Sequence, residues 1–186
     1  MVADPVPAEA LPSQAAPAAA LFECRDISLQ LGGRQILQDI SLSLQRGEVL
    51  GIIGPNGAGK TSLFEVLSGR VAPRSGQVRF RSEDITALKL HQRARLGIGR
   101  TYQTPVVPDE LTVGEVFKAA RQAYRPYCTR HQAEWAAELV HLNVDERLPA
   151  SSLETLNRRK LLLACLLMRR CKLLLLDEPA AGMINA

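Results

Sequence analysis

Several features are missing from this sequence of 186 residues, and each absence narrows the class of protein. No run of about eighteen apolar residues occurs, so no segment is long enough to span a bilayer as a helix by itself. The four cysteines form no C-x-x-C pair, and no histidine and cysteine cluster has the spacing of a metal site. We therefore expect free thiols in a reducing cytoplasm.

A strong excess of charge is also lacking. The net charge is +4 and the pI is about 9.1. Because the basic residues are scattered rather than clustered, we expect no nucleic-acid partner. Residues 1–20 are rich in alanine and proline and lack the basic start and apolar core of a signal peptide. We expect them to form a flexible tail, with the folded domain at residues 21–186.

The first half of that domain predicts strands around one helix. Residues 40–44 alternate apolar and polar side chains, as a half-buried strand does. Residues 49–53 form a short apolar run, which suits a buried central strand. A glycine-rich loop follows, and residues 61–67 can form a helix. Residues 77–81 alternate again and predict another strand.

From about residue 111 the pattern becomes helical. Thr112 and Glu115 have the T-x-x-E spacing of a capping box. Trp135, Leu139 and Leu142 share one helical face, which favours packing into a core over a ligand-binding role. The chain is thus predicted to be a mixed α/β domain with a helical insert.

Two apolar runs close the domain. A helix is expected at about residues 158–170, followed by a buried strand at residues 172–176. No internal repeat is present.

The glycine-rich loop fits the pattern G-x-x-x-x-G-K-[ST] without a gap. Its glycines let backbone amides point inward at phosphate oxygens, and the helix that follows aims its positive end at the same anion. The lysine should reach the β- and γ-phosphates, and the threonine hydroxyl should bind Mg²⁺. The candidate nucleotide-binding residues are Gly54, Pro55, Asn56, Gly57, Ala58, Gly59, Lys60, Thr61 and the adjoining Ser62.

Two carboxylates end the apolar run near the end of the chain. Leu176 is followed by Asp177 and Glu178, the arrangement of a Walker B motif. Asp177 would hold Mg²⁺ directly or through water. Glu178 would lie beside the γ-phosphate and act as the catalytic general base on the attacking water. The competing interpretation is a strand with a solvated acidic end, which the phosphate-binding loop makes less attractive.

Together these motifs resemble those of the ABC ATPases, over nearly everything from Leu21 onward. Gln103, between the two motifs, looks like the family's Q-loop glutamine, which contacts Mg²⁺ and water and couples the site to the helical insert. The resemblance implies an α/β P-loop NTPase core with a helical subdomain at about residues 104–170, incomplete at the C-terminus. It also implies ATP and Mg²⁺ as ligands, with Gln103 among the nucleotide-binding residues and with Thr61, Gln103 and Asp177 at the metal.

Finer features are similar to importer ATPases for branched-chain amino acids and related amides. They lie at residues 83–101, 111–113 and 179–183. This resemblance implies a peripheral subunit on the cytoplasmic face of the inner (plasma) membrane. Its partners would be a membrane permease and a second ATPase subunit, in a homodimer or heterodimer, and its reaction would be ATP hydrolysis coupled to transport.

Three departures from the family affect that expectation. The signature L-S-G-G-Q should precede residues 158–160, but residues 153–157 read Leu-Glu-Thr-Leu-Asn. Glu154 would bring negative charge towards phosphate, and Leu156 replaces a glycine that permits close approach. The family's switch histidine and following strands are absent, and we expect a truncated chain. Leu31 stands where an aromatic residue usually stacks on adenine, which should weaken affinity by about 1 kcal/mol.

Two other functions remain open. One is a nucleotide-binding module or ABC ATPase fragment without turnover, which the altered signature favours and Glu178 disfavours. The other is an ABC protein of DNA repair or translation, although the paired cassettes or long coiled insert common there are absent.

Overall fold

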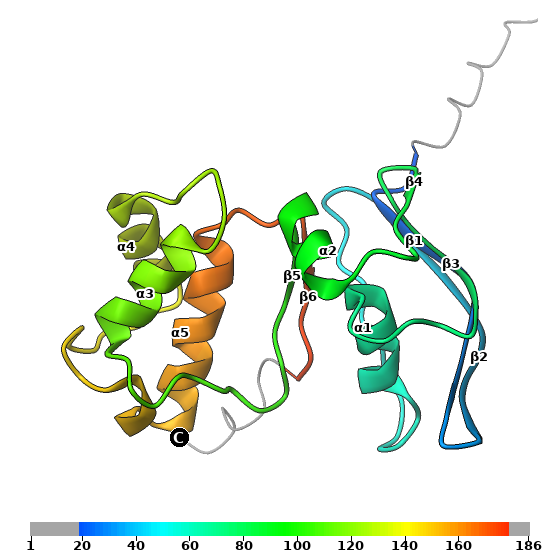
Figure 1. Cartoon of the computed structure of the whole chain (residues 1–186), viewed down its shortest axis with the longest axis horizontal. Coiled ribbons are helices and arrows are strands. Elements are labelled where there is room, and N and C mark those ends of the chain that lie inside the picture. Colours follow the sequence, from blue (N-terminus) through cyan, green and yellow to red (C-terminus); the bar gives the residue numbers. More distant parts are fainter. Residues whose placement is uncertain (1–18, 179–186) are drawn as a thin grey trace, which may run out of the picture.

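The computed structural model describes residues 19–178, and the expected tail and residues 179–186 therefore lie largely or wholly outside the described part. The described chain forms two lobes joined by a pair of strands (Figure 1). In chain order the elements are β1 (Phe22–Leu31), β2 (Arg34–Leu44), α1 (Lys60–Ser68), β3 (Ser75–Phe80), β4 (Glu83–Asp84), α2 (Leu90–Leu96), β5 (Ile98–Arg100), α3 (Val113–Gln122), α4 (Arg130–Leu139), the 3₁₀ turn η1 (Ala150–Ser152), α5 (Thr155–Leu167) and β6 (Leu173–Leu175).

One lobe is an antiparallel sheet with α1 packed against it. Its strand order is β2-β1-β3-β4, and β5 pairs separately with β6 in parallel. Along α1, Leu63, Val66 and Leu67 recur at helical spacing and are buried against β1, β3, β5 and β6. This core fixes the orientation of α1, whose N-terminus continues directly from the glycine-rich loop.

Arg93 fastens the other end of α1. Its side chain is buried and donates to the carbonyl oxygens of Val66, Leu67, Thr86 and Leu88 at 2.8–3.0 Å. Helices leave their last carbonyls without internal partners, and Arg93 on α2 supplies donors to two of them. The arginine therefore ties α1 to α2 and to the chain that leads into β5.

The other lobe consists of α3, α4 and α5. Capping boxes start α3 at Thr112 and α4 at Thr129, each with the side chain three residues later completing the pair. The predicted box of Thr112 and Glu115 is therefore confirmed. The buried side chains that hold the three helices together include Val113, Val116, Phe117, Ala133, Ala136, Leu161, Ala164 and Met168.

The predicted α/β fold is confirmed, and so are the strands at 77–81 and 172–176 and the helix at 61–67, within one or two residues of the observed bounds. The strand predicted at 40–44 is also present, but as the last part of β2, which begins at Arg34. The last helix begins earlier than expected, at Thr155 with Glu154 as its N-cap, and it ends at Leu167. Residue Arg170 has a φ of +50°, which no continuing helix adopts.

The prediction for residues 49–53 is wrong. The apolar run predicts a buried central strand, but no ladder forms there within residues 19–178. The side chains of Val49 and Ile53 are 95% and 97% exposed, and only Ile52 packs partly against the core. This run lines a cavity together with residues 171–176, but within the described residues no backbone pairing joins the two segments, so the run forms no strand.

A second correction concerns the face of α4. Trp135 is 44% exposed and Leu139 is 53% exposed, so these two do not lie in the core. The buried face of α4 instead carries Ala133 and Ala136. Leu142 alone among the three predicted residues packs against the helical core. The close packing of α4 on α5 favours small residues at the contact, which places the large side chains outside.

Candidate active site

The glycine-rich loop at residues 54–59 enters α1 through two left-handed backbone positions. Gly57 has a φ of +81° and Gly59, the N-cap of α1, a φ of +89°. A Cβ atom on Gly59 would lie 2.9 Å from Leu37 Cδ2 and 3.1 Å from the carbonyl oxygen of Ile36. Both the conformation and the close approach to β2 therefore require glycine at this position.

Lys60 folds back over the loop. Its Nζ donates to the carbonyl oxygens of Gly54 at 2.6 Å and Pro55 at 2.8 Å. Among the described ion pairs, none involves Lys60. The ammonium therefore keeps its charge close to the loop and, within the described chain, is held by two neutral oxygens rather than by a carboxylate.

Parallel pairing of β5 and β6 brings two distant segments to the same edge. Ile98 pairs with Leu173 and Arg100 with Leu175, so the residues after each strand emerge side by side. The backbone N–H of Asp177 donates to the Thr101 hydroxyl at 3.1 Å. The sequence-predicted acidic residues are thereby placed next to the segment that contains Gln103.

A buried ion pair holds Asp177. The Arg100 guanidinium lies 3.7 Å from Asp177 Oδ2 and donates to the Ser68 hydroxyl at 2.9 Å. Arg100 also stacks over the ring of Tyr102, 4.8 Å from its centroid. Asp177 Oδ2 is buried and makes no hydrogen bond within the described chain, so this oxygen has an unused acceptor position beside the Arg100 charge.

Gln103 and Glu178 contact each other directly. The Gln103 Nε2 donates to Glu178 Oε2 at 3.1 Å. Glu178 adopts a φ of +47°, a left-handed conformation that is uncommon for a residue with a side chain. Two residues predicted to belong to the same nucleotide site are therefore adjacent, although 75 positions separate them in the chain.

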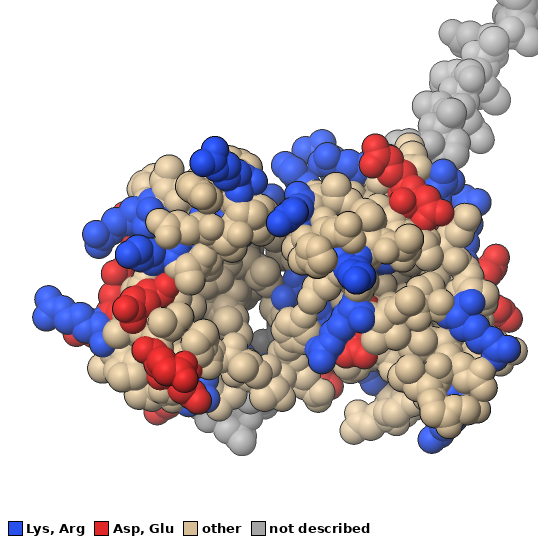
Figure 2. Space-filling model, viewed as in Figure 1, with Lys and Arg blue, Asp and Glu red and all other residues tan. Residues whose placement is uncertain are grey.

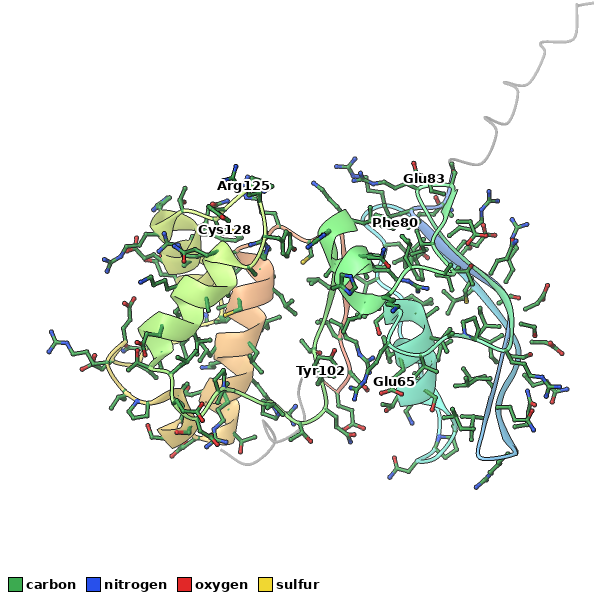
Figure 3. The ribbon with its side chains drawn as sticks, in the orientation of Figure 1. Glu65, Phe80, Glu83, Tyr102, Arg125 and Cys128 are labelled. Atoms are coloured by element: carbon green, nitrogen blue, oxygen red, sulfur yellow. The ribbon has the colours of Figure 1, made fainter. Side chains whose placement is uncertain are left out.

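A cavity of about 630 Å³ lies between α1, the segment after β5, and α5. Thr61, Gln103 and Asp177 all line it. Figure 2 shows a hollow between the two lobes, and Figure 3 shows Tyr102 beside α1, which carries Glu65; both side chains line the cavity. Cys165 lines its helical side, where burial raises the pKa of the thiol to about 12.

The donors in this cavity suit Mg²⁺. A carboxylate, a hydroxyl and an amide carbonyl are the hard oxygen ligands that this ion takes, usually with one or two carboxylates and the remaining positions filled by water or phosphate. The observation that fits is Asp177 Oδ2, which faces Arg100 but makes no hydrogen bond within the described chain. Within residues 19–178 no group of three or more His, Cys, Asp or Glu side chains is arranged to hold a metal ion.

Three of the predicted site residues line this cavity, and the others lie outside its lining. Thr61, Gln103 and Asp177 line it, Glu178 joins through Gln103, and residues 54–60 form the loop that leads into α1. Ser62 is half-buried in the first turn of α1. Leu31, predicted to replace an adenine-stacking aromatic, lies at the exposed end of β1.

Two arginines of the site belong to no motif, and the sequence analysis did not predict them as site residues. Arg100 ends β5 and pairs with Asp177, and Arg159 on α5 donates to the backbone carbonyl oxygens of Gln103 and Glu178. An arginine at the end of a short apolar strand is a signal for the first. Nothing in the local sequence distinguishes Arg159 from the basic residues on either side of it.

The fold and the loop are those of a P-loop NTPase, and the comparisons identify the family. The ABC transporter family profile matches residues 37–181, and this chain belongs to that family. A lipopolysaccharide export system ATP-binding protein, LptB, from Acidithiobacillus ferridurans is 34% identical over 87% of the chain and 68% of its own length. The high-affinity branched-chain amino acid transport ATP-binding protein BraF from Pseudomonas aeruginosa is 32% identical over 88% and 71%.

Solved structures agree on the fold. The ATP-binding cassette MJ1267 of an ABC transporter superposes with a TM-score of 0.75 at 27% identity, covering 89% of this chain and 71% of that one. The cbiO1 protein from Clostridium perfringens, part of the transporter complex cbiONQ, gives 0.72 at 26% identity over 88% and 67%.

The chain matches only part of the length of its relatives. The chain spans 54% of a probable ABC transporter ATP-binding protein from Azorhizobium caulinodans, with which it is 35% identical over 81% of its own residues. No helix among the described residues is both long and apolar enough to cross a membrane.

Proposed function

We propose that residues 54–61 bind the phosphates of ATP and that the chain is the ATP-binding part of an ABC transporter subunit. Lys60 would leave the Gly54 and Pro55 carbonyls for the β- and γ-phosphates, an exchange of neutral acceptors for charged ones. Thr61, Gln103 and Asp177 would hold Mg²⁺ from one side of the cavity. The single observation that carries this proposal is the convergence of these three side chains beside the glycine-rich loop.

The proposed reaction is hydrolysis of ATP. Glu178 would accept a proton from the water that attacks the γ-phosphate in line, and Gln103, which already contacts Glu178, would help to orient that water. Mg²⁺ would neutralise charge that develops on the phosphate oxygens. Lys60 would contribute positive charge from the loop, and Arg100 would keep Asp177 at the cavity wall.

The same proposal includes the partner subunits and the transported substrate. A membrane permease and a second ATPase subunit would work with this chain on the cytoplasmic face of the membrane. The patterns at residues 83–101 and 111–113, together with the BraF relative, favour import of branched-chain amino acids or related amides. The LptB relative belongs to an export system, so direction of transport is the first point on which the proposal can fail.

Equilibrium binding of ATP tests the nucleotide site. We expect Mg²⁺-dependent binding by calorimetry, reduced at least about tenfold in Lys60→Ala because a charge-assisted contact to phosphate is lost. Lys118→Ala is the matched control, since Lys118 is an exposed residue of α3 and its replacement should leave the affinity unchanged. Equal affinity in all three proteins would contradict the proposed site.

Steady-state phosphate release tests the reaction. Glu178→Gln removes the base with little change in shape, and it should abolish release while retaining ATP binding. Phosphate release that persists in Glu178→Gln would contradict the assignment of Glu178 as the general base. Transport of radiolabelled leucine in cells that carry the subunit would test the cargo.

A second candidate function is nucleotide binding without turnover. Glu154 is the exposed N-cap of α5, so a carboxylate stands at the helix end where the family's signature would meet phosphate. Binding without phosphate release in the wild-type chain, unchanged by Glu178→Gln, would favour this candidate.

A further inference from the structure

Arg159 makes a connection between the lobes that no motif accounts for. It lies on α5, whose buried residues Leu161 and Ala164 belong to the helical core. Its guanidinium donates one hydrogen bond to the carbonyl oxygen of Glu178 at 2.8 Å and another to the carbonyl oxygen of Gln103 at 2.9 Å. These acceptors follow β6 and β5 respectively, so a single side chain reaches both segments of the site.

The neighbours of Arg159 on α5 behave differently. Arg158 donates to the carbonyl oxygens of Leu153 and Ser151, and Lys160 to that of His141. All three acceptors belong to the helical part of the chain. Of these three consecutive basic residues, therefore, Arg159 alone is hydrogen-bonded to the segments that follow the strands.

The contacts of Arg159 close a ring. Gln103 donates from its side chain to the Glu178 carboxylate, while Arg159 holds the backbone of both residues. A guanidinium presents its donors in a fixed fork, so it sets the separation of two acceptors in a way that a flexible ammonium cannot. The position of α5 and the distance between Gln103 and Glu178 are thereby linked mechanically.

We propose that Arg159 is a positioning residue, which transmits the position of the helical lobe to Gln103 and Glu178. The proposal rests on the proposed ATPase function for its kinetic consequence. It gives the side chain of Arg159 no contact with the nucleotide: a displacement of α5 moves the two backbone carbonyls and so makes or breaks the contact between the Gln103 amide and the Glu178 carboxylate.

Kinetics on the complete transporter subunit give the first test. Arg159→Ala should lower kcat about tenfold or more, the range found when partners that orient site residues are removed. KM for ATP and the affinity for ATP should stay within about twofold, because residues 54–61 are untouched. Arg159→Lys should recover only part of kcat, since an ammonium cannot hold both carbonyls in a fork.

A double-variant cycle distinguishes positioning from a general loss of stability. If Arg159 acts through Gln103, then Arg159→Ala should cost little more in a Gln103→Ala background, and the two effects will not add. Arg158→Ala is the matched control: it removes an arginine from the same helix that also donates to two carbonyls, and it should leave kcat within about twofold. Additive losses, or an equal loss in Arg158→Ala, would overturn the proposal.

Hydrogen exchange supplies a readout that does not depend on turnover. In the nucleotide-free protein the amides of residues 101–104 should exchange faster in Arg159→Ala than in wild type or Arg158→Ala, because the Gln103 backbone has lost its link to α5. If the wild type releases no phosphate, the proposed hydrolysis fails, and exchange alone then decides whether Arg159 positions this segment. Unchanged exchange in Arg159→Ala would overturn the inference in either case.

Discussion

The guanidinium of Arg100 and the carboxylate of Asp177 form an ion pair of 3.7 Å whose side chains are only 3% and 6% exposed. The two residues are far apart in the chain, and the parallel pairing of β5 with β6 is what brings them together. Arg100 has two more partners, the Ser68 hydroxyl and the Tyr102 ring. The position of the predicted metal ligand Asp177 therefore depends on Arg100, which lines the same cavity.

Removal of Arg100 should be costly. In Arg100→Ala the Asp177 carboxylate stays buried without its counter-charge, and the free energy of unfolding should fall by about 3–5 kcal/mol. Urea denaturation measures it. Arg70→Ala is the control, since Arg70 stacks on the same Tyr102 ring at 5.6 Å but is 54% exposed and should cost less than about 1 kcal/mol. Similar losses in the two variants would contradict a special role for the buried pair.

Arg93 should be the second costly arginine. Arg93→Met leaves buried carbonyl oxygens of Val66 and Leu67 without this donor, so we expect a loss of about 3 kcal/mol or more. Arg95→Met, at an exposed position of the same helix, should cost less than about 0.5 kcal/mol.

The loss in Arg93→Met should not vary between pH 6 and pH 8.5. Burial lowers the pKa of Arg93 to about 10, still well above this range, and in the unfolded chain its pKa is higher. Both states therefore keep the proton, and linkage appears only when the pH approaches 10, where the folded state releases it first. A pH-dependent difference between wild type and Arg93→Met near neutrality would contradict this.

The capping box of α3 should make stability depend on pH. The backbone N–H and the hydroxyl of Thr112 donate to the Glu115 carboxylate and lower its pKa below the usual value. Stabilisation is therefore complete above the unfolded pKa of about 4.5 and is lost as the pH falls through the lower folded pKa. The destabilisation caused by Glu115→Ala should shrink as the pH falls below about 4.5.

The second capping box offers the control. At α4 the uncharged Gln132 fills the same role, and its Oε1 accepts from the Thr129 N–H at 2.7 Å. The destabilisation caused by Gln132→Ala should not change over the same pH range. Parallel pH profiles for the two variants, from urea unfolding, would show that the Glu115 charge is not responsible.

The Cys165 thiol should be unreactive in the folded protein. Burial raises its pKa to about 12, so the thiolate that attacks alkylating reagents is scarce at pH 8. Pulse labelling with iodoacetamide and peptide mapping should find Cys165 modified at least about a hundredfold more slowly than in urea. Labelling at the rate of a free cysteine would mean that the cavity between the lobes opens readily.

Replacement of Trp135 should matter little for stability. Its side chain is 44% exposed, so Trp135→Ala should lower the free energy of unfolding by less than about 1 kcal/mol. Phe117→Ala, which empties a buried position in the same lobe, should cost about 3–5 kcal/mol. The free energies of unfolding are measured by urea denaturation with circular dichroism. Equal losses in the two variants would indicate that the Trp135 side chain is buried in the core.

The glycine-rich loop, the capping box at Thr112 and the last strand could be predicted because each follows from local chemistry. Gly59 must adopt a positive φ, Thr112 and Glu115 satisfy each other's backbone, and residues 173–175 are apolar on both faces. The adjacency of Gln103, Asp177 and Thr61 was expected only through the family resemblance. The parallel pairing of β5 and β6 brings the segments of Gln103 and Asp177 together, and the packing of α1 adds Thr61 to the same cavity; a list of motifs contains neither.

By itself the sequence determined the glycine-rich loop, the acidic end of β6 and the α/β character, since these depend on residues close together in the chain. Only the tertiary structure decided the exposure of Val49 and Trp135 and the partners of Arg100 and Arg159. Burial and ion pairing depend on which distant segments pack against a residue, and the hydrophobic pattern of the sequence does not specify those segments. An apolar residue is buried only where another part of the fold covers it.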